Sequence, residues 1–371
     1  MKILVSFGTR PEAIKMAPVI YEMKKQGVHH VICNTGQHLE MLEQVLEFFE
    51  IESDHNLNLM THDQSLNSLS ANILTRLDEI LNEEKPDWVL VHGDTTTSVM
   101  TAWAAFHKGI PVAHVEAGLR TYKKNSPFPE ELNRQITAKL ADLHFAPTEQ
   151  AKENLRNENI ENEKIVVTGN TVVDALDLGK LKLETQEDPI CFAGLEKDIT
   201  KLKYILVTGH RRENLGAGFD EICEALLELK RSENIDLIYP VHLNPNVKAQ
   251  VHDKLGNIPG IHLIDPVNYP EMLWLMMNCE FIISDSGGIQ EEAPGLGKKV
   301  LVTRNFSERM EGVNAGFSIL TGTDKKRILA EAKELLKNPF DPVGLKSPYG
   351  DGKASERIIN TLLNPHLPFN N

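Results

Sequence analysis

The chain of 371 residues contains no apolar run long enough to cross a bilayer, since a membrane helix needs about 20 consecutive apolar residues. Its first residues, Met1–Val5, lack the charged, apolar and small-residue regions of a signal peptide. We therefore expect neither a membrane protein nor a secreted one, and we predict a cytoplasmic location.

Positive charge is scarce as well. The chain has 39 Lys and Arg residues against 53 Asp and Glu residues, which gives a formal net charge of −14. So acidic a protein has no broad electrostatic attraction for a nucleic-acid backbone or an anionic membrane. We expect neither as a partner, and an anionic ligand would need a local pocket.

Cysteine is rare and scattered. No C-x-x-C pair occurs among the four cysteines, which are Cys33, Cys191, Cys223 and Cys279. This spacing is not that of a disulfide framework or a zinc site. We interpret each cysteine as a small buried hydrophobic residue.

What the chain does contain is typical of an ordinary globular protein, with 41% apolar and 25% charged residues. Its length suits two hydrophobic cores. Short β-rich runs alternate with helical patterns such as Leu66–Leu81 and Phe219–Leu229, which predicts parallel sheets covered by helices. The predicted strands are Ile3–Phe7, His30–Asn34, Trp88–His92, Val112–Val115, Leu143–Ala146, Ile165–Thr168, Tyr204–Thr208, Leu237–Val241, Ile261–Ile264, Phe281–Ser284 and Val300–Thr303.

The alternation breaks in a charged stretch around residues 179–203, which contains Pro189 and Gly194. We therefore predict one domain over residues 1–178, a linker over 179–203 and a second domain over 204–353. A last helix within 354–371 is expected to cross back to the first domain. The fold class is α/β, with two doubly wound Rossmann-like domains and a ligand cleft between them.

Two strand exits carry the residue types of an anion site. The first strand leads into Gly8–Glu12, where Arg10 is followed by Lys15 on a helix. A later strand leads into Ser286-Gly287-Gly288, with Glu292 one helical turn further on. Free N–H groups at a helix start attract anions, and glycine lets a phosphate approach closely. The alternative is that both are plain strand-to-helix turns.

Acidic side chains follow two other strands. Asp94 and Glu116 each come directly after a predicted strand, and Glu130 opens the next helix. Desolvation and mutual repulsion would make such a cluster suitable for proton transfer. For the neighbouring Glu131 we prefer helix capping. His210 and His242 follow strands in the second half and are further candidates.

Together these motifs resemble the non-hydrolysing UDP-N-acetylglucosamine 2-epimerases, in the right order and over nearly the whole chain. The matching segments are Gly8–Pro18, His92–Thr96, Val115–Arg120, Pro127–Arg134, Gly209–Asn214 and Asp285–Glu292. The resemblance implies a glycosyltransferase-B-like fold, a homodimer, and no metal or redox cofactor. It also implies reversible conversion of UDP-N-acetylglucosamine to UDP-N-acetylmannosamine, a product used in cell-surface polysaccharide synthesis.

By position in these motifs, the resemblance implies the site residues. Asp94, Glu116 and Glu130 would be the acid–base groups, with His210 beside the diphosphate. The remaining candidates for binding the substrate are Arg10, Lys15, Arg134, His242, Met272, Ser286, Gly287, Gly288, Glu292 and Arg309. The chain departs from the family pattern at two places. Met272 stands where an aromatic residue often lies near the uracil, and Met310 replaces the proline that usually follows the position of Arg309.

Many bacterial members bind a second substrate molecule as an activator. In this chain Gln37, Arg211 and Arg212 are the candidates for that pocket, and Glu40 and Asp63 stand where a glutamine and an arginine are expected. Two acids facing a diphosphate would repel it. We therefore predict weak or absent activation.

The chemistry of the family explains the residue types. A base removes the C2 proton while the bond from C1 to UDP breaks, and UDP then adds back while a second group protonates C2 on the opposite face. Four alternatives stay open. They are a hydrolysing 2-epimerase that releases N-acetylmannosamine and UDP, a glycosyltransferase of the same fold, a sugar-nucleotide sensor without activity, and an enzyme for a related nucleotide sugar that is altered at C3, C4 or C6.

Overall fold

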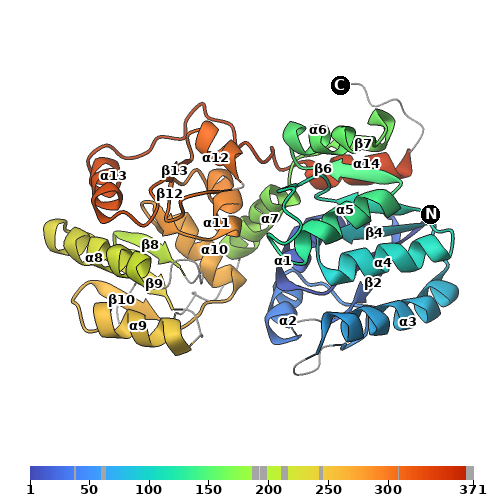
Figure 1. Cartoon of the computed structure of the whole chain (residues 1–371), viewed down its shortest axis with the longest axis horizontal. Coiled ribbons are helices and arrows are strands. Elements are labelled where there is room, and N and C mark those ends of the chain that lie inside the picture. Colours follow the sequence, from blue (N-terminus) through green and yellow to red (C-terminus); the bar gives the residue numbers. More distant parts are fainter. Residues whose placement is uncertain are drawn as a thin grey trace. The chain divides into compact units, whose positions relative to one another are not determined.

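The structure, a computed structural model, describes residues 1–36, 39–59, 64–185, 192, 199–209, 216–241, 245–307 and 309–364. It divides into two compact units. Unit 1 comprises Met1–Leu178 and Gly350–Asn371, and unit 2 comprises Gly179–Tyr349. Each unit is built on a parallel sheet with helices packed on it (Figure 1). The predicted class of two doubly wound α/β units is confirmed.

Unit 1 contains a seven-stranded sheet in the order β3-β2-β1-β4-β5-β6-β7. Its strands are β1 (Lys2–Phe7), β2 (His29–Asn34), β3 (His55–Asn56), β4 (Trp88–His92), β5 (Val112–Val115), β6 (Leu143–Ala146) and β7 (Ile165–Val167). Its helices are α1 (Arg10–Lys25), α2 (Leu39–Phe48), α3 (Leu66–Glu84), α4 (Thr96–His107), α5 (Glu130–Leu140), α6 (Glu149–Asn157) and α14 (Ala354–Leu363). Helix α7 (Thr171–Thr185) begins in unit 1 and ends in unit 2.

The strand order of unit 1 reverses between β1 and β4. From β1 the chain moves outward through β2 and β3, and it then returns to place β4 on the other side of β1. Helices that leave two such strands diverge, which opens a crevice at the carboxyl ends of the strands. The turns that follow β1 and β4 therefore occupy the position where α/β sheets bind ligands.

The last helix belongs to unit 1 although unit 2 precedes it in the chain. Asp174 on α7 accepts hydrogen bonds from the N–H groups of Ala354 (3.2 Å) and Ser355 (2.7 Å), the first residues of α14. Arg357 on α14 donates to the carbonyl oxygen of Thr168 at 2.9 Å. These bonds satisfy amides that a helix start otherwise leaves free, and α14 packs against α1.

Unit 2 contains a six-stranded sheet in the order β10-β9-β8-β11-β12-β13, which reverses between β8 and β11. Its strands are β8 (Tyr204–Thr208), β9 (Asp236–Pro240), β10 (Ile261–Ile264), β11 (Ile282–Ser284), β12 (Val300–Val302) and β13 (Ser318–Leu320). Its helices are α8 (Ala217–Ser232), α9 (Pro245–Leu255), α10 (Tyr269–Asn278), α11 (Gly287–Glu292), α12 (Met310–Asn314) and α13 (Lys325–Lys337). Among the described residues, no helix combines the length and apolarity that crossing a membrane requires.

The core of unit 1 includes polar side chains as well as aliphatic ones. His114 on β5 and His144 on β6 are paired in register and fully buried. Burial lowers the pKa of His114 to about 3 and the pKa of His144 to about 4. Both imidazoles are therefore neutral in the folded chain. Since a carbonyl oxygen can only accept, His114 Nε2 donates to the Gly93 carbonyl at 2.7 Å.

This burial predicts that unit 1 loses stability in mild acid. The folded pKa values lie below the ordinary value of 6.5, so the unfolded chain takes up protons that the folded chain does not. Stability is therefore lost as the pH falls below about 6.5. Between about pH 7.5 and about pH 5.5 the free energy of unfolding should fall by about 3 kcal/mol, measured by urea denaturation. In a His144→Gln variant the fall should be about half as large, and an equal fall would contradict this assignment.

Candidate active site

Glu116 follows β5 and lies in an ion pair with Lys15 of α1. The side chains are only 12% exposed for Lys15 and 10% for Glu116, so the pair is largely shielded from water. Asn170 Nδ2 donates to the same oxygen, Glu116 Oε2, at 3.0 Å, and His92 Nε2 lies 3.8 Å from it. Asn170 was not predicted, because it lies outside the motifs that single out the acids.

The backbone of Glu116 also has an unusual conformation, with a φ of +62°. A residue with a β-carbon rarely adopts positive φ, and such strain is concentrated at functional sites. A β-carbon built on Gly93 would lie 3.8 Å from Glu116 Oε1, so the carboxylate lies beside the turn that carries Asp94.

Asp94 follows β4 and is bonded to the start of α5. Arg134 Nη2 lies 2.6 Å from Asp94 Oδ2, and Asn133 Nδ2 donates to the carbonyl oxygen of Asp94 at 2.8 Å. Arg134, a predicted substrate-binding residue, therefore also holds an acid of the cluster. Because Glu130 opens the same helix, these bonds bring the third predicted acid close to the turn after β4.

The adjacent acids Glu130 and Glu131 have opposite surroundings. Glu131 is fully buried and accepts from Thr121 N (2.9 Å), Tyr122 N (3.0 Å), Gln135 Nε2 (2.9 Å) and Arg134 Nη1 (3.3 Å). Burial opposes its charge, but the hydrogen bonds outweigh burial and lower its pKa. The capping interpretation was wrong, since the backbone donors lie in the loop before the helix.

Glu130, by contrast, is half-buried, and no hydrogen bond to its Oε2 is found in the described part of the chain. Around two neighbouring strand exits, unit 1 therefore presents two acids in ion pairs and one with a buried oxygen that has no hydrogen-bond partner among the described residues. Carboxyl groups in such different surroundings suit the transfer of protons to and from a bound substrate. Within the described ranges, no three His, Cys, Asp or Glu side chains are grouped so as to hold a metal ion.

In unit 2 the predicted nucleotide residues gather at the reversal point between β8 and β11. Thr208 Oγ1 and Ser284 Oγ lie 2.6 Å apart, which ties the two strand ends together. Ser286 N donates to Ser284 Oγ at 3.0 Å, and Ser286 is the N-cap residue of α11. Gly287 and Gly288 begin that helix and Glu292 ends it.

Arg309 lies directly against this helix. Its Nε and Nη2 are 2.9 and 2.8 Å from Glu291 Oε1. A β-carbon built on Gly287 would lie 2.8 Å from Arg309 Cζ, so only glycine leaves room for the guanidinium in this position. Ser307 Oγ accepts from Arg309 N at 3.1 Å and donates to Gln290 Oε1 at 2.6 Å. These bonds hold the segment before Met310, which has no proline to stiffen it.

The other predicted site residues are distributed as follows. Arg10 is the first residue of α1, and Met272 lies half-buried on α10. Five predicted residues lie outside the described ranges, and their roles stay predictions: Gln37, His210, Arg211, Arg212 and His242.

Comparison with known proteins identifies the family. The profile of the UDP-N-acetylglucosamine 2-epimerase family matches residues 22–363. The UDP-N-acetylglucosamine 2-epimerase of Escherichia coli strain K12 is 48% identical over 380 aligned residues, which cover 99% of this chain and 100% of that protein. The chain belongs to the UDP-N-acetylglucosamine 2-epimerase family.

Solved structures agree with the family assignment. The UDP-GlcNAc 2-epimerase from Neisseria meningitidis, crystallised with UDP-GlcNAc, superposes with a TM-score of 0.87 at 46% identity and covers 98% of this chain and 100% of its own. The glycotransferase of kitacinnamycin superposes with a TM-score of 0.63 at 13% identity over 99% of both chains, a likeness of fold alone. The glycosyltransferase-B-like architecture predicted for this family member is confirmed.

The contrast between the adjacent acids predicts different effects on stability. In a Glu131→Gln variant an amide nitrogen, which cannot accept, would face loop N–H groups. The free energy of unfolding should fall by about 2 kcal/mol, because buried donors lose their acceptor. Glu130→Gln is the matched control and should not lower it, because Glu130 Oε2 accepts no hydrogen bond from the described residues. Urea denaturation measures both, and equal effects would show that the loop does not depend on Glu131.

Proposed function

We propose that this chain interconverts UDP-N-acetylglucosamine and UDP-N-acetylmannosamine by inverting C2 without net hydrolysis. The observation that carries the proposal is the cluster of Asp94, Glu116 and Glu130 around the reversal point of the sheet in unit 1. The relative from Neisseria meningitidis binds UDP-GlcNAc, which supports the same substrate here.

The reaction needs a proton removed from C2 and returned on the opposite face. One carboxylate takes the proton while the electron pair of the C1–O bond leaves with UDP, which gives 2-acetamidoglucal. UDP then adds back to C1 as a second carboxyl group protonates C2. Asp94 is ion-paired with Arg134 and Glu116 with Lys15, so both are suited to accept a proton. Glu130 Oε2 has no hydrogen-bond partner among the described residues. Such a set can supply both transfers.

Binding of the diphosphate is proposed for cationic and hydroxyl groups of unit 2, where Ser286, with Arg309 against Gly287, lies at the reversal point of the sheet. Arg10, the first residue of α1, and Lys15, further along that helix, are proposed as substrate-binding residues of unit 1. His210 is proposed to donate to the same diphosphate. Cations and hydroxyl groups in these places would stabilise the charge that develops on UDP as the C1–O bond breaks.

The test is proton NMR of the wild-type protein with UDP-N-acetylglucosamine in D₂O. UDP-N-acetylmannosamine should form, and deuterium should enter C2 of both sugar nucleotides. Free N-acetylmannosamine with an equal amount of UDP would instead support the hydrolysing reaction. An unchanged spectrum would contradict the proposal.

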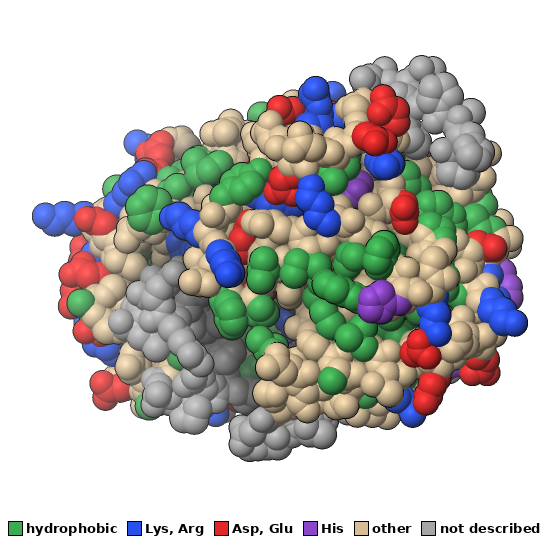
Figure 2. Space-filling model, turned by 45° about the vertical axis from the view of Figure 1, so that its right-hand side comes forward, with side chains coloured by type: hydrophobic (Ala, Val, Ile, Leu, Met, Phe, Trp, Pro, Cys, Tyr) green, Lys and Arg blue, Asp and Glu red, His purple; other side chains and the backbone are tan. Residues whose placement is uncertain are grey.

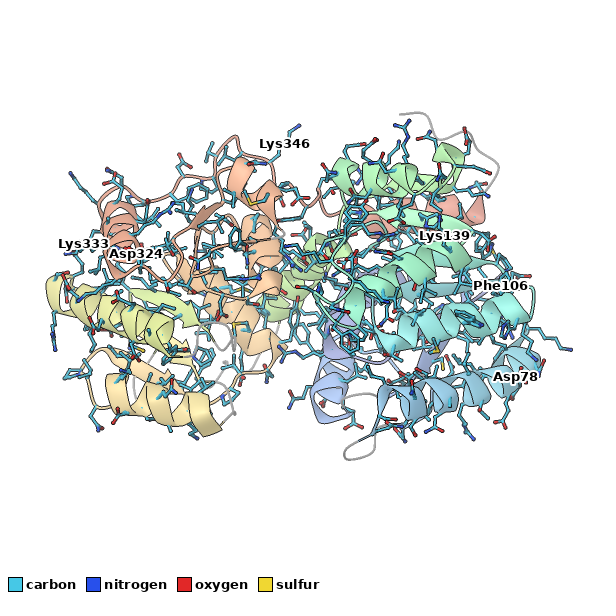
Figure 3. The ribbon with its side chains drawn as sticks, in the orientation of Figure 1. Asp78, Phe106, Lys139, Asp324, Lys333 and Lys346 are labelled. Carbon is cyan, nitrogen blue, oxygen red and sulfur yellow. The ribbon has the colours of Figure 1, made fainter. Side chains whose placement is uncertain are left out.

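Substitution of an acid tests the assigned roles. Glu116→Gln should lower kcat by at least about a hundredfold, since general acid–base groups contribute about 10²–10⁴. Asp78→Asn is the control, because Asp78 lies on α3 in an exposed ion pair with Lys108 (Figure 3). It should keep kcat within about twofold, as exposed pairs contribute little. A Glu116→Gln variant with the activity of the control would exclude Glu116 from proton transfer.

We further propose that the protein is a homodimer that uses the outer face of α4. Trp103 and Phe106 on this helix are 38% and 60% exposed, and His107 packs beside both rings. Figure 3 labels Phe106, and Figure 2 shows hydrophobic side chains next to a histidine on the surface facing the viewer. Aromatic residues are enriched in interfaces, and a two-fold axis would bring the same face of each copy together.

Light scattering after gel filtration tests this surface. The wild-type protein should have the mass of two chains, and Phe106→Glu should shift it toward the mass of one, because it buries a charge in each half of the contact. Val343→Glu in unit 2 is the control, since Val343 is 85% exposed and lies outside the proposed surface. A dimer in all three proteins would place the interface elsewhere.

A further inference from the structure

Glu12 lies in the first turn of α1 and is only 2% exposed. Its Oε2 accepts from Gly8 N at 3.0 Å, from Thr9 N at 2.8 Å and from Thr9 Oγ1 at 2.8 Å. Its Oε1 accepts from Thr95 Oγ1 at 2.6 Å and from Ser98 Oγ at 3.0 Å. One buried carboxylate thus receives five hydrogen bonds, all from neutral donors.

The two oxygens serve different parts of the chain. The bonds to Oε2 are local and belong to the capping of α1, where Thr9 is the N-cap residue. The bonds to Oε1 come from α4, whose N-cap residue is Thr95. Capping of α1 requires only the first set, so the second set needs another explanation. Through both sets, a single side chain joins the turns after two neighbouring strands, β1 and β4.

Burial works against this arrangement. Desolvation raises the pKa of Glu12, and the hydroxyl and amide donors only partly offset it. An apolar residue at this position would avoid that cost, and a capping residue at the surface would avoid it too. A buried acid is therefore expected here only if the link between the two turns matters.

The two linked turns are connected to two of the acid–base groups of unit 1. Lys15 lies one turn further along α1 and bonds Glu116, and Asp94 immediately precedes Thr95 and bonds Arg134. Ser98 Oγ also lies within hydrogen-bond distance of the carbonyl oxygen of His92 at the end of β4, so its single hydroxyl hydrogen is shared between that oxygen and Glu12. A shift of either turn would therefore change the separation of Lys15 from Asp94, and with it the geometry of both ion pairs.

We propose that Glu12 is a positioning residue of the epimerase reaction, which holds the turn after β1 and the turn after β4 in register so that the two acids keep their places. The inference rests on the proposed function. Glu12 acts through Lys15 and Asp94 and takes no part in the proton transfers. Misplacement of catalytic groups by about 1 Å can cost about a hundredfold in rate.

Glu12→Gln is the test variant because it keeps the shape and removes acceptor capacity. An amide has one accepting oxygen and a donating NH₂ group, so one set of donors loses its acceptor. The variant should lower kcat by about tenfold to a hundredfold and change KM by less than about threefold. The acidic limb of the pH profile of kcat should move upward by about half a unit or more, because a loosened Lys15 supports the charge of Glu116 less well.

Glu22→Gln is the matched control. Glu22 lies on the same helix, is 9% exposed and is bonded by Lys25 (3.0 Å) and Gln26 (2.9 Å), away from the two turns. Its kcat and pH profile should match those of the wild-type protein. A Glu12→Gln variant that only lowers the amount of active protein, with an unshifted pH profile, would overturn the positioning role.

Ser98→Ala separates the link from the cap. This variant removes the contacts of Ser98 Oγ with Oε1 and with the His92 carbonyl oxygen, and it leaves Thr9 and Thr95 as N-cap residues. It should lower kcat in the same direction as Glu12→Gln, and the double variant should lose less than the product of the two single losses, because both act on one network. Independent, multiplying effects would show that Glu12 does not act through α4.

Amide hydrogen exchange tests the link without any substrate. In Glu12→Gln, segments 8–16 and 94–101 should both exchange at least about tenfold faster, whereas a plain cap would affect only the first. If both segments exchange faster in Glu12→Gln but the wild-type protein leaves UDP-N-acetylglucosamine unchanged, the proposed function is refuted. The structural link between the two turns through Glu12 would still be supported. Faster exchange in the first segment alone would refute the link whatever the activity.

Discussion

In unit 1, β1 pairs in parallel with β4 at Ile3–Trp88, Leu4–Val89 and Val5–Leu90, and the geometry of the acid cluster depends on this pairing. The two strands are distant in sequence, and the helices after them run to opposite sides of the reversal point. Their first turns therefore meet at the carboxyl edge of the sheet. Asp94 lies in one of these turns, and Glu116, which follows β5, the next strand, is ion-paired with Lys15 of α1.

The cluster combines charge with restricted motion. Lys15 and Arg134 each neutralise one acid, and Asn170 supplies a further donor to Glu116. Buried pairs of this kind contribute little net stability, because desolvation offsets their attraction. They fix positions instead, which a reaction with two proton transfers on opposite faces of one carbon requires. In unit 2 the same principle applies to Arg309, which Glu291 holds against Gly287.

Most of the architecture follows from local sequence patterns. Continuous apolar runs such as Ile3–Val5 are fully buried on both faces of the sheet, which is the pattern of a parallel strand. Strand β3 was not predicted, since two residues are too few to give a period, and strand β13 was also missed. The predicted linker over 179–203 begins inside a helix, because α7 continues to Thr185. Charged residues at its exposed end do not interrupt helical hydrogen bonding.

The sequence by itself determined the alternation of strands and helices, the acidic strand exits and the family, because each is encoded in short runs of neighbouring residues. Only the tertiary structure decided which side chains meet. Glu131 reaches loop amides rather than its own helix, and Glu12 serves α4 as well as α1. Both bonding patterns depend on strand order and on burial. Those are properties of residues far apart in the chain, and no local pattern records them.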